Sequence, residues 1–162
     1  MNTANMKVGA LATIVADSTD VGGTTEPYQF SVEATTQEFF VEQSQFPVIS
    51  KTISRTAKST TALAEPTVDN LAIAYGLPTG NVATSALQID SGERGNFTFV
   101  ATTGAASAPG TAKHRVFNFP ETTVGGTPSL NYAKEEMSVL SLEFTHLANG
   151  AGVVGMISDV SD

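Results

Sequence analysis

EPTVDNLAIAYGLP, residues 65–78, is the strongest helix signal in the chain. Its apolar residues recur at the i, i+3, i+4 and i+7 spacing that places side chains on one face of a helix. Pro66 suits a first helical position, because its missing N–H is no loss there, and Gly76 is a typical stop. We expect a helix over about residues 65–76, packed against a sheet through this face. The face consists of Val68, Leu71, Ala72 and Tyr75.

Strand and turn patterns fill the chain on both sides of this helix. Apolar and polar residues alternate around Phe97 and Phe99, and again over residues 139–145, as expected for strands with one buried face. The predicted fold class is mainly β, an antiparallel β-sandwich or barrel-like domain with one flanking α-helix, in a single domain over residues 1–162. Other strands are expected at residues 6–15, 28–33, 38–45, 85–90, 113–120 and 153–157, with glycine-rich loops at residues 104–110 and 122–128.

Composition excludes several classes of protein. The 162 residues are enough for one domain with a core, and no apolar run is long enough for a membrane helix, so we expect no membrane insertion. The N-terminal MNTANMK lacks the apolar stretch of a signal peptide. Cysteine is absent, which excludes disulfides and thiolate metal sites. A net charge of −8 argues against a protein that holds nucleic acid by neutralising phosphates.

No pattern of catalytic or ligand-binding residues emerges. His114 and His146 lie in strand patterns without patterned acids nearby, so packing or surface roles are expected for them rather than metal binding. Glu135 and Glu136 are adjacent and would point to opposite faces of a strand. The glycine pairs do not precede a helix, and no Gly-x-Ser-x-Gly motif is present. We therefore expect that the protein is not an enzyme and that it binds neither a cofactor nor a metal.

Residues 49–63, ISKTISRTAKSTTAL, form an unusual predicted strand. They are rich in β-branched residues, which favour a strand, yet they are polar on both faces apart from Ile49, Ile53 and Leu63. The segment holds three cations and no acid, in an acidic chain; these cations are Lys51, Arg55 and Lys58. One interpretation is a solvated edge strand whose lysines block aggregation. The other is a segment that meets another subunit.

The regular alternation of a strand predicts how these cations are arranged. Lys51 and Arg55 are an even number of residues apart and should share a face, whereas Lys58 should lie on the other. Such a segment could meet acids of a neighbouring subunit. The candidate acidic partners are Glu38, Glu42, Asp90 and Glu93.

The order of the elements and several short sequence segments resemble those of the tail tube proteins of tailed bacteriophages. The resemblance extends over about residues 41–159. The first segment begins with FPV at residues 46–48 and continues through the polar strand. It then contains LAEP at residues 63–66 and LAIAYG at residues 71–76. The second is HRVFNFP at residues 114–120. The third is VLSLEFTH at 139–146, then Asn149-Gly150 and VGMI at 154–157.

This resemblance implies an assembly function without catalysis. Subunits of this family form rings, typically hexameric, in which long strands join a ring-shaped inner β-barrel around a lumen. The rings stack into a tube that conducts DNA from the capsid to the host without sequence-specific binding. In such a tube Lys58 could face the lumen and touch DNA phosphates. The implied partners are other copies of the chain and other tail proteins, such as the tape measure, terminator and distal tail proteins. The implied location is the tail of the virion, after assembly in the host cytoplasm.

Other classes of protein remain open at this point. Related inner tubes occur in contractile tails and in bacterial injection systems. A capsid decoration or head-completion protein would share the acidic β character but would lack a self-stacking surface. A carbohydrate-binding sandwich would be expected to carry exposed aromatic residues, yet Trp is absent and only three Tyr are present.

Overall fold

The computed structural model describes residues 11–40, 46–64, 66–83, 86–103, 113–131 and 139–161. The fold is mainly β, as predicted, and its main sheet is antiparallel and nine-stranded. The glycine-rich loop expected at residues 104–110 lies outside the described residues, as do Glu42, Glu65 and the first ten residues.

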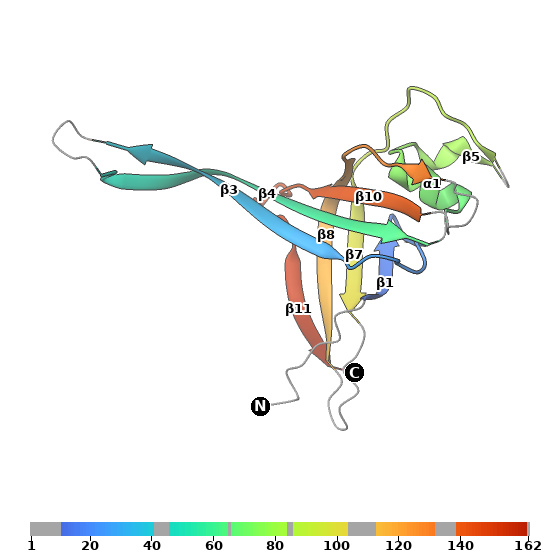
Figure 1. Cartoon of the computed structure of the whole chain (residues 1–162), viewed down its shortest axis with the longest axis horizontal. Coiled ribbons are helices and arrows are strands. Elements are labelled where there is room, and N and C mark those ends of the chain that lie inside the picture. Colours follow the sequence, from blue (N-terminus) through green and yellow to red (C-terminus); the bar gives the residue numbers. More distant parts are fainter. Residues whose placement is uncertain are drawn as a thin grey trace.

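The main sheet runs in the order β2-β1-β7-β8-β10-β4-β3, with β11 paired to β8 and β9 paired to β10. β8 belongs to two layers, because it pairs with β7 and β11 and then, through residues 122–125, with β10. Figure 1 shows β3, β4 and β10 crossing over β1, β7, β8 and β11. The strands are β1 (Leu11–Ala16), β2 (Thr19–Asp20), β3 (Gln29–Phe39), β4 (Ile49–Leu63), β7 (Phe97–Thr103), β8 (Lys113–Gly125), β9 (Leu130–Asn131), β10 (Val139–His146) and β11 (Met156–Ser161).

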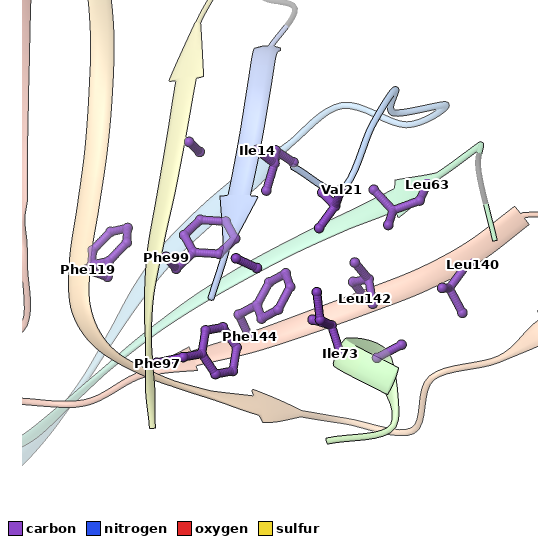
Figure 2. Packing of buried hydrophobic residues seen from close by; sticks show 13 residues of the cluster. Ile14, Val21, Leu63, Ile73, Phe97, Phe99, Phe119, Leu140, Leu142 and Phe144 are labelled. Atoms are coloured by element: carbon purple, nitrogen blue, oxygen red, sulfur yellow. The ribbon is translucent and has the colours of Figure 1, made fainter. Parts of the chain in front are cut away.

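The hydrophobic core fills the space between these two layers (Figure 2). The predicted alternation is confirmed in β7 and β10, where every second side chain is buried. Phe99 of β7 meets Phe144 of β10 with ring centroids 4.7 Å apart. Ile14 of β1 and Leu63 of β4 are fully buried in the same cluster, so both layers contribute to it.

The helix is shorter than predicted, and its buried residues are only in part those of the predicted face. α1 spans Val68–Ala74, and the Thr67 side chain caps it by accepting a hydrogen bond from the Asn70 N–H. Pro66 therefore lies before the cap and not at the first helical position. Gly76 has a φ of +64°, as expected for a residue that ends a helix.

The predicted packing face of the helix was partly wrong. Ala72 is buried and Leu71 is partly buried against the core, but Tyr75 is 41% exposed. Ile73, which the pattern did not select, is 1% exposed and points into the core (Figure 2). The short helix contacts β10 as well as the small sheet formed by β5 (Val82–Ala83) and β6 (Ala86–Leu87), so consecutive residues are buried instead of a single stripe. A 3₁₀ turn, η2 (Thr79–Asn81), lies between the helix and β5.

Other predicted boundaries also require correction. The two strands expected at residues 28–33 and 38–45 form one strand in the described part, β3. The loop expected at residues 122–128 is strand as far as Gly125, because these residues pair with β10. The last strand begins at Met156 and not at Val153. Of the strand expected at residues 85–90, residues 86–87 form β6 and residues 88–90 are outside any strand.

Candidate assembly surface

The most distinctive feature of the molecule is a two-stranded arm. We use this name for residues 31–40 and 46–56, the outer parts of β3 and β4 with their flanks. Every arm residue is exposed, and residues 49–56 pair only with β3. Figure 1 shows the arm projecting from the body along the longest axis. An isolated two-stranded hairpin is marginally stable in water, so a layer packed on the arm would stabilise it.

A β-bulge in the arm reverses the predicted arrangement of the cations. Thr35 pairs with Ser54 and Thr36 pairs with Thr52, which leaves Ile53 as an extra residue of β4. Residues that pair across an antiparallel ladder share a face, and Arg55 pairs with Ala34 whereas Lys51 pairs with Gln37.

Ala34 and Gln37 are an odd number of residues apart on β3, so Arg55 and Lys51 lie on opposite faces of the arm. Lys58 pairs with Ser31 and therefore shares the face of Lys51. The prediction that Lys51 and Arg55 share a face was wrong, because it assumed a regular strand without a bulge.

Ion pairs within the chain separate these cations into two groups. Lys58 Nζ lies 2.9 Å from Glu143 Oε1, and this hydrogen bond raises the Lys58 pKa. Neither Lys51 nor Arg55 forms an ion pair with any residue that the structure describes. The sequence did not indicate the acid that Lys58 meets, because Glu143 is 85 residues away and is brought close by the pairing of β4 with β10.

Two of the predicted acidic partners lie far from the arm. Glu38 is on the arm itself, opposite Ser50, on the same face as Arg55. Asp90 and Glu93 belong to the segment that follows β6, and Figure 1 shows α1 and β5, beside this segment, at the opposite end of the molecule from the arm. Glu42 lies outside the described residues.

The exposed large hydrophobic side chains of the described residues gather in only three places. The arm holds half of them, and Phe46 at its tip is 79% exposed. A second group, Tyr75 and Ile89, lies beside the C-terminal end of α1. The third belongs to the C-terminal segment: Leu147, Val153, Met156, Ile157 and Val160. The members on the arm are Val32, Phe39, Phe40, Phe46, Val48, Ile49 and Ile53.

The root of the arm is anchored by a buried polar network. Ser59 Oγ lies 2.6 Å from His146 Nε2, and His146 Nδ1 lies 2.9 Å from Thr122 Oγ1. Tyr28 Oη joins the network at 2.7 Å from Ser59 Oγ. The His146 ring stacks on Phe119 with centroids 3.8 Å apart. The network thus joins four parts of the chain where the arm leaves the body. They are Tyr28 before β3, and the strands β4, β8 and β10.

This network is placed for packing and not for contact with a substrate. A serine within hydrogen-bond reach of a histidine is the geometry of an activated nucleophile. Here, however, Ser59 is 1% exposed and His146 is 3% exposed. Burial lowers the pKa of His146 to about 4 and raises that of Tyr28 to about 12, so both side chains are neutral near pH 7. Neither Ser59 nor His146 lines the surface hollows beside Thr61, Tyr75 and Pro78.

No family model and no curated protein sequence matches this chain. Within the described ranges, the structure contains no group of three or more His, Cys, Asp or Glu side chains arranged to hold a metal ion. The same residues include no helix with the length and apolar character required to cross a membrane.

Proposed function

We propose that this chain is a structural subunit of a phage-type tail tube, in which copies join through their arms into stacked rings around a lumen. The observation that carries the proposal is the arm, which is exposed on both faces and holds half of the exposed large hydrophobic residues described. Burial of apolar surface is worth about 25 cal/mol per Å². Covering the arm with another copy therefore favours association.

The open edges of the sheet support the same proposal. β3 pairs with β4 on one side only, and β11 pairs with β8 on one side only, so both carry unpaired backbone groups along an edge among the described strands. Long unpaired edges promote association with further strands, and closure of a barrel removes them. Strands of this kind fit a ring in which neighbouring subunits continue one another's sheets.

The charges suit a wall past which DNA moves without being held. The chain carries a net charge of −8. Arg94, Arg115 and Lys58 are paired with carboxylates of the same chain. An acidic lumen would repel the phosphate backbone, so DNA would pass without being trapped. The virion tail as the location, and the other tail proteins as partners, follow from this proposal.

Electron microscopy of the purified protein over a concentration series tests the proposal. We expect rings with a central opening at low concentration and tubes at high concentration. Light scattering on the same samples gives the assembled fraction. Protein that remains monomeric at every concentration and salt level, and that is absent from the tails of mature particles, would contradict the proposal.

A charge-reversed variant tests whether the arm is the assembly surface. Lys51→Glu combined with Arg55→Glu changes only exposed residues, so the folded monomer should be retained, as checked by circular dichroism. We expect this variant to assemble poorly at low salt. Assembly as efficient as that of the unmodified protein at both low and high salt would show that the arm cations are not at a contact.

A further inference from the structure

The end of the molecule opposite the arm carries a small surface with complementary chemistry. We call it the helix-end patch; it consists of Tyr75, Ile89, Asp90 and Glu93. A hydrogen bond from Arg94 N to the Gly76 oxygen, at 2.6 Å, holds its segment beside the end of α1, and one from Gln88 N to the Asn81 oxygen, at 2.9 Å, joins it to η2. Tyr75 and Glu93 line one hollow of about 340 Å³.

The helix-end patch combines apolar surface with carboxylates that have no cation. Ile89 is 75% exposed and is among the most exposed large hydrophobic residues described. Asp90 and Glu93 form no ion pair with any described residue, because the neighbouring Arg94 is bound to Asp17. The arm presents the opposite combination: exposed apolar side chains beside Lys51 and Arg55, which form no ion pair with any described residue.

The two faces of the arm are not equally suited to an acidic partner. The face of Lys51 also carries Glu33 and the Lys58–Glu143 pair, so an acidic surface placed there would meet acids. The face of Arg55 carries Val32 and Ala34 beside the guanidinium. The acid on this face is Glu38, which lies four residues beyond Ala34 along β3. The Arg55 face is therefore the better complement to the helix-end patch.

Arm and patch lie at opposite ends of the longest axis (Figure 1). A contact between different surfaces of identical subunits is heterologous, and it generates a ring if the rotation closes or a filament if it does not. From these observations we infer that the Arg55 face of the arm docks on the helix-end patch of a second copy, with Val32 against Ile89 and Arg55 against Asp90 and Glu93. This inference rests on the proposed function and specifies the contact that joins one subunit to the next.

Disulfide trapping tests the contact directly, because the chain contains no cysteine. A Val32→Cys protein is mixed with a size-tagged Ile89→Cys protein, allowed to assemble, and treated with a mild oxidant. We expect a crosslinked heterodimer on a non-reducing gel, since a disulfide requires Cα atoms about 4.4–6.8 Å apart. Ser31→Cys is the matched control, because Ser31 is adjacent to Val32 but points to the opposite face.

A second measurement uses charge reversal with rescue. Arg55→Glu should raise the concentration needed for half-maximal assembly by roughly ten-fold, because each contact changes from attraction to repulsion. Adding Glu93→Lys should restore most of the loss. Lys51→Glu is the control for the opposite face, and its effect should not be rescued by Glu93→Lys.

The outcomes separate this inference from the function on which it rests. If the protein forms rings or tubes but Val32→Cys crosslinks no better than Ser31→Cys, and Glu93→Lys fails to rescue Arg55→Glu, the contact is wrong and the tube proposal stands. If the unmodified protein never assembles, both are wrong. Trapping that is specific for Val32→Cys, together with rescue, supports the contact.

Discussion

Ser59 and His146 are joined by a hydrogen bond of 2.6 Å between Oγ and Nε2, directly beneath the root of the arm. Ser59 is in the part of β4 that pairs with β10, and His146 is the last residue of β10. The bond is enclosed by aromatic rings, including that of Phe119 stacked on the imidazole. A buried polar group is costly unless it is satisfied, so this pair secures the position from which the arm projects.

Stability should fall as the pH decreases from about 6.5 to about 4. Burial lowers the pKa of His146 in the folded protein to about 4, from its ordinary value of 6.5. Between these two values the unfolded chain binds a proton that the folded chain does not. The free energy of unfolding is therefore unaffected by this group above pH 6.5 and decreases below it, by about 3 kcal/mol in total. Denaturant titrations at a series of pH values measure the slope.

His146→Gln provides the control for this pH dependence. The variant should be less stable overall, because a packed and hydrogen-bonded ring is lost. Its stability should nevertheless change less between pH 7 and pH 5 than that of the unmodified protein. Identical slopes for the two proteins would mean that another group is responsible for the dependence.

Ile73→Ala should destabilise the fold by about 2–4 kcal/mol, because it removes a buried side chain and leaves a cavity. Ile73 is 1% exposed within the core cluster, between the helix and the sheet. Tyr75→Ala, two residues later on the exposed side, should change the stability by no more than about 0.5 kcal/mol. Thermal or urea unfolding of dilute protein compares the two. A larger loss of stability for Tyr75→Ala than for Ile73→Ala would show that the helix face predicted from the sequence is the buried one.

Gly155→Ala should destabilise the protein by about 1–3 kcal/mol through overpacking. A methyl group at Gly155 would overlap the Phe119 ring and would lie 2.6 Å from the Asn118 carbonyl oxygen. Gly150→Ala is the matched control, since a methyl group there meets nothing within 4 Å. If the two variants unfold at the same denaturant concentration, the close approach of residue 155 to β8 is not present in solution.

Arg94→Ala should cost about 2–4 kcal/mol, because hydrogen bonds that involve charged groups contribute about 1.5–3 kcal/mol each. The Arg94 guanidinium contacts Asp17 at 2.5 Å, and its Nε donates to the Leu77 oxygen at 2.9 Å. Arg94→Lys should recover only part of the loss, because an ammonium cannot reproduce the planar fork. Urea unfolding provides the measurement. Full stability in Arg94→Lys would show that charge alone matters at this position.

Local patterns were sufficient to predict much of this fold. Residues 49–63 were predicted as one strand from their β-branched composition, and β4 has the same bounds. The alternation in β7 and β10 identified their buried faces because each strand has one face on the core and the other turned away. The positive φ of Gly76 agrees with the helix stop that its residue type indicated.

The remainder depended on pairings between residues that are distant in the sequence. A bulge forms only when two strands are aligned, so no pattern within β4 could indicate that Ile53 would place Lys51 and Arg55 on opposite faces. The partners of Lys58 and Arg94 lie 85 and 77 residues away, and the network around His146 is assembled from separate strands. Helix burial likewise followed from what surrounds α1 and not from its own periodicity. Side-chain chemistry within one segment selects strand or helix, but the identity of its neighbours is decided when the sheet closes over the core.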